Sequence, residues 1–441
     1  MIELTILGLA AVLATPVDQQ IDAAIAPYFQ AGAPGASVIV VKDGKTIFRK
    51  GYGMADVAKG VAMDASFQHR IGSVTKQFTS TAILMLAEEG KLALDDDITK
   101  HLPDYPTKGK KITIEHLLTH TSGIVSYTGK PSFRAIMTQD LAPAALIAVF
   151  KDDPLNFEPG TRYAYNNSGY VLLGAIIEKA SGMPYAKFVE QRIFVPLGMA
   201  DTAYGGYARG KAPPAVGHST TPTGFRLATP ISMTLPYAAG AIVSTVDDLA
   251  RWDASVTSGK LLRPASWQRA FTPYKLASGE ATSYGYGWNI DTMQGSARIF
   301  HGGGIPGFST HVMRLPQEKV YVAVLANNDR LPMSTSVVAA RAAAIAIGKP
   351  YPDFSPVALA PAALDEFVGK FAQRTVTRDG GKLFMQRGDE AKAEIVAIGA
   401  TRFLVPNTLV YMDFVRDDAG KVSALKLFQN DSVEHHPRSG E

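Results

Sequence analysis

The chain has 441 residues, of which 46% are apolar and 19% charged, with a formal net charge of +4 and no cysteine. Such a composition predicts a globular protein of two or more domains, and the small net charge argues against a nucleic-acid partner. The absence of cysteine excludes disulfides, thiolate nucleophiles and cysteine-based zinc sites.

The sequence begins with an apolar run, residues 4–14. This run is too short to span a bilayer, and the small residue Ala14 at its end is typical of a secretory signal, although Glu3 stands where a basic residue is usual. We therefore expect residues 1–15 to be a signal segment of an exported, periplasmic protein. An N-terminal helix packed on the body of a cytoplasmic protein is the alternative. No later segment is long and apolar enough to predict a transmembrane helix.

Three elements are predicted next along the chain. Helical spacing of apolar residues indicates a short helix near residues 18–29. Two β-rich runs on either side of Asp43-Gly44 predict a hairpin. A run starting at Ser73 is apolar on most sides and ends at Gly90, which predicts a buried helix.

Later segments divide into a helical part and a strand part. Residues 91–237 are mainly helical with loops, whereas apolar residues alternate after Ser283, as in antiparallel strands. Residues 16–349 therefore predict an α+β fold, an α/β sandwich whose antiparallel sheet is flanked by helices, with the helical lobe inserted. A proline-rich linker, 350–363, precedes short strands that predict a small all-β domain over residues 364–441.

An S-x-x-K pattern occurs twice, at Ser73–Lys76 and at Ser423–Lys426. Ser423 lies in a strand pattern, where residues three apart point to opposite faces, so this serine and lysine cannot cooperate. Ser73 and Lys76 lie at the start of a helix, where residues three apart share a face.

The helical placement gives Ser73 and Lys76 a possible chemistry. The N–H groups and dipole at a helix N-terminus favour an alkoxide, and a lysine against an apolar helix is desolvated toward the neutral form that a base needs. On this motif alone, an N-cap serine followed by a surface lysine is the favoured alternative.

The single Y-x-N of the chain, Tyr165-Asn166-Asn167, lies in a loop before a helix that starts near Ser168. The tyrosine can relay a proton if a nearby cation such as Lys76 lowers its pKa. Asn167 offers both a donor and an acceptor to a substrate or to the lysine. A polar loop that caps the next helix is the alternative.

A third motif, "IFHGGGIPGF", places His301 at the end of a strand pattern, followed by three glycines. Glycines on a strand edge allow another backbone or a ligand to approach closely. The backbone N–H of Gly304, together with that of Ser73, could form an oxyanion hole. A wide turn carrying a surface histidine is the alternative.

In this order the three motifs resemble the serine β-lactamase-like and penicillin-binding protein superfamily, whose members carry S-x-x-K, then Y-x-N, then K-T-G or a variant. "HLLTHTSG", "YGYGW" and "HGGGIPGF" are typical of its class C-like branch, which holds class C β-lactamases, D,D-peptidases, D-aminopeptidases and family VIII carboxylesterases. The resemblance covers about residues 16–348, and the small β domain resembles an appendage of some members.

The resemblance implies a role for each matching residue. Ser73 would be the acylated nucleophile, Lys76 its base and Tyr165 the proton relay, with Asn167 orienting substrate. His301 would stand where K-T-G has its lysine, and Gly303 would match its glycine. No K-T-G or K-S-G stands at that position, and a mostly neutral histidine anchors a carboxylate weakly. The departure favours esters, or peptides with D-residues, over β-lactams.

The expected function is therefore ester hydrolysis through an acyl-enzyme, with penicillin binding and weak β-lactam turnover. A D-amino-acid peptidase, a β-lactamase or a non-catalytic scaffold are the alternatives. The expected partner is a small ester, β-lactam or D-peptide, and the chain could be a monomer or a dimer. No cofactor or metal site is expected, because neither H-E-x-x-H nor a phosphate-binding loop occurs.

Three further residues have two interpretations each. Tyr127 and Trp288 could line the cleft or pack in the core. For His120, within "THTSG", we expect a structural role at the end of a helix.

Overall fold

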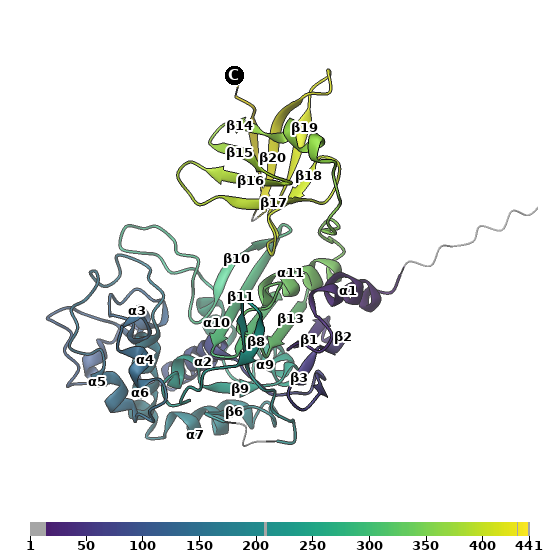
Figure 1. Ribbon diagram of the computed structural model, residues 1–441. Coiled ribbons are helices and arrows are strands. Elements are labelled where there is room, and N and C mark those ends of the chain that lie inside the picture. Colours follow the sequence, from purple (N-terminus) through teal and green to yellow (C-terminus); the bar gives the residue numbers. More distant parts are fainter. Residues whose placement is uncertain (1–14, 207–209, 430, 440–441) are drawn as a thin grey trace, which may run out of the picture.

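The computed structural model describes residues 15–206, 210–429 and 431–439. Of the expected signal segment, all but Thr15 lies outside these residues. Figure 1 shows three parts: a sheet flanked by helices, a helical lobe beside it and a small β domain above the sheet. The predicted α+β class, with its antiparallel sheet, helical lobe and C-terminal β domain, is confirmed. None of the described helices is long and apolar enough to cross a membrane.

The central sheet is antiparallel and has the order β10-β11-β12-β13-β1-β2. Strand β1 pairs with β13 from Ala36↔Ala326 to Lys42↔Val320, so both ends of the larger domain contribute to one sheet. The β1–β2 turn forms as predicted, with positive φ at Asp43 and Gly44. The strands are β1 (Ala36–Lys42), β2 (Lys45–Tyr52), β10 (Asn289–Met293), β11 (Ser296–Ile305), β12 (Phe308–Leu315) and β13 (Val320–Ala326).

Helices cover both faces of this sheet. Alternate residues of a strand face opposite ways, so Val322 of β13 packs in the cluster under α1 and α11, while Ala323 packs in the larger core on the other side. Because both faces are buried, β13 is apolar throughout. The covering helices are α1 (Val17–Ile25), α2 (Thr75–Glu88), α9 (Val246–Ser258), α10 (Pro264–Ala270) and α11 (Thr335–Ala346).

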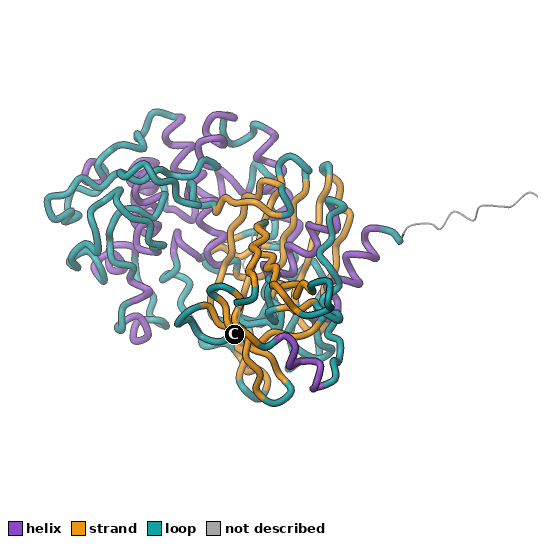
Figure 2. The backbone as a smooth tube through the Cα atoms, turned by 90° about the horizontal axis from the view of Figure 1, so that it is seen from above, coloured by secondary structure: helices purple, strands orange, loops and turns teal. Residues whose placement is uncertain are grey.

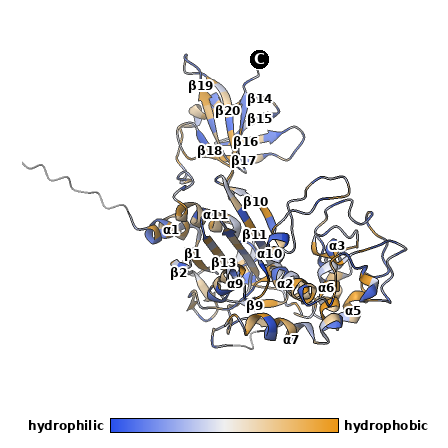
Figure 3. Ribbon diagram, turned by 180° about the vertical axis from the view of Figure 1, so that it is seen from behind, coloured by the Kyte–Doolittle hydropathy of each residue, from blue (hydrophilic) through white to orange (hydrophobic). Residues whose placement is uncertain are grey.

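The helical lobe lies to one side of the sheet when the molecule is seen from above (Figure 2). Apolar residues gather in the central sheet and in α6 of the lobe (Figure 3). The lobe contains η3 (Ile98–Lys100), α3 (Ile114–Leu118), η4 (Tyr127–Gly129), α4 (Phe133–Ile136), α5 (Pro143–Ala148), α6 (Asn167–Ser181), α7 (Tyr185–Val189), η5 (Glu190–Phe194) and α8 (Tyr237–Gly240). Short strands that the sequence patterns do not predict lie outside the central sheet: β3 (Met54–Asp56), β4 (Val61–Ala62), β5 (His69–Arg70), β6 (Ala203–Tyr204), β7 (His218–Thr221), β8 (Gly224–Leu227) and β9 (Ile242–Ser244).

The C-terminal domain is a meander of eight antiparallel strands, closed by a bridge between Phe371 and Arg438. Phe367 of η6 (Pro361–Phe367) is buried in the core of this domain, and its ring centroid lies 4.8 Å from that of Phe414. Ser423 lies in β20 and donates to the carbonyl of Val415, as expected for a serine outside any active site. The strands are β14 (Gly369–Phe371), β15 (Arg374–Asp379), β16 (Lys382–Arg387), β17 (Ala393–Ala397), β18 (Arg402–Leu404), β19 (Tyr411–Arg416), β20 (Val422–Gln429) and β21 (Ser432–Pro437).

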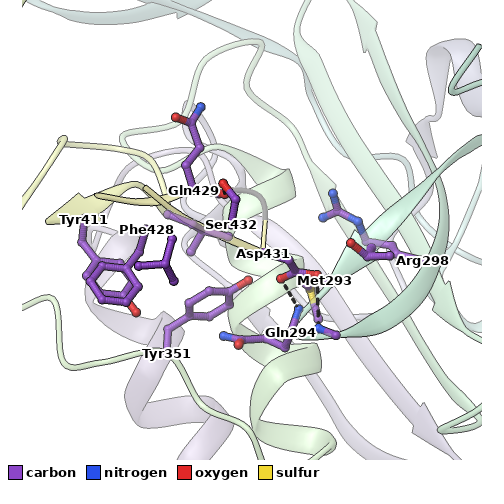
Figure 4. A pocket seen from close by; sticks show the side chains of 13 residues that line it. Met293, Gln294, Arg298, Tyr351, Tyr411, Phe428, Gln429, Asp431 and Ser432 are labelled. Atoms are coloured by element: carbon purple, nitrogen blue, oxygen red, sulfur yellow. Dashed lines mark hydrogen bonds between the residues drawn. The ribbon is translucent and has the colours of Figure 1, made fainter. Parts of the chain in front are cut away.

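The C-terminal domain meets the larger domain at the β10–β11 turn. Asp431 accepts hydrogen bonds from the backbone N–H groups of Gln294 and Gly295, at 2.6 and 3.1 Å. A pocket of about 290 Å³ lies at this junction, with the ring of Tyr351 in its wall (Figure 4). The junction is at the Ser296 end of β11, and the strand continues past His301 to Ile305, so the prediction that His301 ends the strand is wrong.

Three buried histidines predict a loss of stability in acid. Burial lowers the pKa of His69 to about 4, and the pKa values of His301 and His311 to about 3. At a pH below 6.5, the ordinary pKa of histidine, these side chains bind protons in the unfolded chain but not in the folded chain. The free energy of unfolding therefore falls as the pH drops from 6.5, by about 1.4 kcal/mol per pH unit for each histidine.

Urea unfolding of the wild type and His311→Gln between pH 7 and pH 5 measures this effect. Carboxylates contribute to both proteins and cancel in the comparison. We expect the slope of unfolding free energy against pH to be shallower in the variant by about 1.4 kcal/mol per pH unit. Equal slopes would contradict the assignment of a neutral, buried imidazole at this position.

Candidate active site

Ser73 lies in η2 (Gly72–Val74), a short 3-10 turn that runs directly into α2. Gly72 has φ +51°, and a Cβ at this position would lie 3.0 Å from the backbone nitrogen of Gly304. Glycine therefore allows the nucleophile turn and strand β11 to approach each other closely. This approach brings the first and third motifs of the sequence together.

Lys76 lies in the first turn of α2 and is completely buried. Its Nζ is 3.1 Å from Ser73 Oγ, 2.8 Å from Asn167 Oδ1 and 2.9 Å from the carbonyl oxygen of Ala239. Amide and carbonyl oxygens can only accept, so they take the two protons of a neutral amine. The lone pair is left for the hydroxyl proton of Ser73.

Desolvation holds the pKa of Lys76 well below its ordinary value of 10.5. No carboxylate is hydrogen-bonded to its amino group among the contacts of the described residues, so no opposite charge there offsets the cost of burying an ammonium ion. The alternative of a surface lysine is therefore wrong. A neutral amine at hydrogen-bonding distance from a serine hydroxyl is a general base.

Tyr165 approaches the same serine from the loop before α6. Its hydroxyl is hydrogen-bonded to Ser73, and Lys76 Nζ lies 4.8 Å from its ring centroid. Although 41% of the residue is exposed, desolvation in the cleft raises the pKa of Tyr165, and the bond to Ser73 opposes only part of this rise. The expectation that Lys76 lowers this pKa is wrong, because the lysine is itself desolvated toward the neutral amine. Tyr165 is thus a neutral phenol that can donate a proton.

Asn167 is the first residue of α6 and lies between Lys76 and the lobe. Its Oδ1 binds Lys76, while its Nδ2 donates to Thr128 Oγ1 at 3.0 Å. The neighbouring Asn166 caps the helix by accepting from the N–H of Gly169 at 2.8 Å. Asn166 therefore caps the helix, and Asn167 holds the side chain of Lys76 in place.

His301 is buried, with 3% of its surface exposed, so the alternative of a surface histidine is wrong. Its Nδ1 lies 2.6 Å from the carbonyl oxygen of Gly302, which can only accept, so the proton is on Nδ1. Nε2 then accepts from the hydroxyl of Tyr284 at 2.9 Å. Burial lowers the pKa of His301 to about 3. The residue in the place of the K-T-G lysine therefore carries no charge at neutral pH.

Gly303 and Gly304 have different environments on β11. A Cβ on Gly303 would lie 2.0 Å from the carbonyl oxygen of Ile71, whereas a Cβ on Gly304 would meet nothing within 4 Å. Gly303 is thus needed for the contact between β11 and the nucleophile turn. Gly304 lines a pocket together with Ser73, so that their backbone N–H groups can meet one oxyanion.

The pocket beside Ser73 has a volume of about 240 Å³. Tyr127 lines it, with its hydroxyl donating to the carbonyl of Leu235 at 2.6 Å. Trp288 does not reach it: this residue is 2% exposed and packs against Phe271, with ring centroids 5.4 Å apart. The pocket is lined by Gly72, Ser73, Tyr127, Thr128, Phe133, Asn167, Ile231, Pro236, Ala239, Gly240, Gly304, Ile305 and Pro306.

Sequence reasoning missed three residues that contact the site. Tyr284, which binds His301, lies in the quoted "YGYGW", where the motif was a usable signal. Thr128 and the carbonyl of Ala239 carry no sequence signal, because a backbone oxygen and a loop hydroxyl acquire their roles only through the fold. In the described part of the chain, no group of three or more acidic, histidine or cysteine residues could hold a metal.

A serine, a neutral lysine and a tyrosine, placed between a sheet-and-helix body and a helical lobe, define an active-site serine hydrolase. The chain belongs to the β-lactamase family, whose model matches residues 17–347.

Known proteins resemble this chain over different lengths. Penicillin-binding protein 4* of Bacillus subtilis (strain 168) is 28% identical, over 91% of this chain and 94% of its own. The octameric penicillin-binding protein homologue from Pyrococcus abyssi superposes with a TM-score of 0.68 at 27% identity, covering 96% of this chain and 99% of its own. A D-stereospecific amidohydrolase from Streptomyces sp. has a TM-score of 0.59 at 29% identity, covering 71% of this chain and 94% of its own.

The environment of Gly303 generates a prediction. Gly303→Ala should displace β11 from the nucleophile turn, because its Cβ would overlap the carbonyl of Ile71. We expect kcat for p-nitrophenyl butyrate to fall about 100-fold, the effect of misplacing a reacting group by about 1 Å. Gly302→Ala is the matched control, since its Cβ would meet its nearest atoms at an ordinary 3.7 Å. Equal effects of the two changes would contradict this account.

The pKa shifts predict the pH dependence of the reaction. Lys76 acts as a base only when neutral, so kcat/KM should rise with pH through a midpoint well below 10.5. Tyr165 acts as an acid only when protonated, and its raised pKa keeps the proton beyond the ordinary value of 10.0. A pH–rate profile with an alkaline fall centred below pH 10.0 would argue against the neutral phenol.

Proposed function

We propose that the protein hydrolyses uncharged esters of short carboxylic acids through an acyl-enzyme on Ser73. The placement of Lys76 carries this proposal: its two protons are accepted by Asn167 and Ala239, and Ser73 Oγ is its third neighbour. This arrangement favours removal of the hydroxyl proton and attack by Oγ on an acyl carbon.

In the proposed reaction, the proton of Ser73 Oγ moves to Lys76 Nζ as Oγ bonds to the acyl carbon. The N–H groups of Ser73 and Gly304 stabilise the resulting oxyanion. The bond to the leaving oxygen then breaks, and Tyr165 gives that oxygen its proton and regains one from Lys76. Deacylation repeats these steps with water in place of the serine hydroxyl and returns the carboxylic acid.

The pocket supports an uncharged substrate. Its described lining carries no charged side chain, and most of its larger side chains are apolar. His301 is held neutral and occupied by Tyr284, so it offers no ion pair to a carboxylate. A β-lactam with its carboxylate would lose hydration without a compensating ion pair, which favours slow turnover of such compounds. The small volume favours a short acyl chain.

A second candidate is hydrolysis of D-amino-acid amides or peptides. The similarity to a D-stereospecific amidohydrolase over 71% of the chain supports it. Amide cleavage makes greater use of the Tyr165 proton than ester cleavage does, since an amine leaves only when protonated. No acidic side chain lines the pocket to receive a free amino group, which places this candidate behind the ester.

A panel of substrates tests the proposal. We expect release of p-nitrophenol from the butyrate ester at a kcat/KM at least tenfold above that for the laurate ester. The rates for a penicillin and for D-alanyl p-nitroanilide should be lower than for the butyrate. Ser73→Ala should reduce butyrate hydrolysis by about 10³-fold or more, because it removes the nucleophile.

Ser423→Ala is the matched control, since it removes the serine of the other S-x-x-K and should leave the rate unchanged. Equal rates of the wild type and Ser73→Ala would overturn the hydrolase. Faster turnover of the D-alanyl anilide than of the butyrate ester would instead establish the second candidate.

A further inference from the structure

His120 holds the backbone on both sides of Tyr165. Its carbonyl oxygen accepts from the N–H of Ala164 at 2.9 Å, and its Nδ1 accepts from the N–H of Asn166 at 3.1 Å. The residue has φ +59°, a conformation uncommon outside glycine that asparagine, aspartate and histidine adopt more often than other residues. His120 therefore holds the N–H groups of the residues before and after the tyrosine.

The imidazole of His120 also supports the ring of Tyr165. The two ring centroids lie 4.3 Å apart, and the rings of Tyr284 and Tyr170 lie 4.7 and 5.1 Å from the imidazole. His120 is 1% exposed, so this packing is dry. Tyr165 itself is 41% exposed, so its buried side rests on the histidine while its outer side faces solvent.

The protonation state of His120 agrees with this role. Burial holds the pKa of His120 well below 6.5. A neutral imidazole whose Nδ1 accepts from Asn166 carries its proton on Nε2. Nε2 has no hydrogen-bond partner in the described part of the chain. The polar contact of the imidazole is therefore the one that Nδ1 makes to Asn166, beside Tyr165.

We propose that His120 is a positioning residue for the reaction: by accepting from the N–H groups of Ala164 and Asn166 and packing against the ring of Tyr165, it fixes the phenol beside Ser73. The expectation of a role confined to the end of α3 is thereby extended. The inference rests on the proposed function, because it assigns to Tyr165 the transfer of a proton in turnover.

Two substitutions separate the two contacts of the side chain, which are the hydrogen bond of Nδ1 and the packing of the ring against Tyr165. In His120→Asn, the side-chain oxygen occupies the place of Nδ1 and can accept from Asn166, and asparagine tolerates positive φ, but the ring is lost. In His120→Phe the ring is kept and the acceptor is lost. His120→Ala removes both contacts. His218→Asn is the control, since His218 is also buried, at 3% exposure, and its ring contacts Phe225.

We expect His120→Ala to lower kcat for p-nitrophenyl butyrate about 100-fold while KM changes less than about threefold. His120→Asn and His120→Phe should each lose part of this rate. His218→Asn should retain the wild-type kcat. Melting temperatures of all variants show whether they fold, and if His120→Ala does not, His120→Asn takes its place.

A double-mutant cycle with Tyr165→Phe decides between positioning and a general structural role. If His120 acts through Tyr165, its replacement should cost less than about threefold once the phenol is gone. An undiminished loss in the Tyr165→Phe background would overturn the inference, as would a wild-type kcat in folded His120→Ala. Turnover that Ser73→Ala does not reduce would overturn the proposed function instead, so the two failures are distinguishable.

Discussion

The burial of one lysine is the constraint on which the rest of the site depends. Placing an ammonium group in a dry interior costs several kcal/mol, whereas a neutral amine with its two protons accepted is tolerated there. The first three turns of α2 are buried on every side, so the fold keeps Lys76 in the form that can take a proton. Asn167 from α6 and the carbonyl of Ala239 from α8 complete this environment. Packing of the helical lobe onto α2 therefore supplies the acceptors that keep the lysine basic.

The groups around the lysine are neutral as well. His120 and His301 are buried with lowered pKa values, and Tyr165 and Tyr284 keep their protons. Charge therefore arises in the cleft only when a reaction creates it. Fixed N–H and O–H dipoles in such a region can stabilise a developing oxyanion without first reorganising around a resident ion. The same absence of fixed charge weakens the hold on anionic substrates.

Much of the fold could be predicted from local patterns. Alternation identified the strands after Ser283, and the Asp43-Gly44 turn defined the first hairpin. Thr113 is a usual N-cap residue, and it caps α3 by accepting from the N–H of His116 at 3.1 Å. The order of the three motifs indicated Ser73 and Lys76. Their spacing on a helix placed both side chains on one face.

The remainder depended on tertiary contacts. Burial reversed the expected direction of the Tyr165 pKa, and no local pattern reports how deeply a loop tyrosine is desolvated. Trp288 packs in the core rather than in the cleft, where its ring contacts the ring of Phe271. The two bonds that His120 makes around Tyr165 join segments more than forty residues apart in the sequence. The short strands β7 and β8 lack the length and alternation that identify strands in a sequence.

The seating of the C-terminal domain on the β10–β11 turn separates this domain from the chemistry. Each residue assigned to the chemistry lies between Gly72 and Gly304, and the C-terminal domain touches the other end of β11, through Asp431. The nucleophile and its base therefore do not depend on any side chain of the C-terminal domain for their geometry. A substitution within that domain can alter its own surface while the contacts of Lys76 with Ser73, Asn167 and Ala239 are kept.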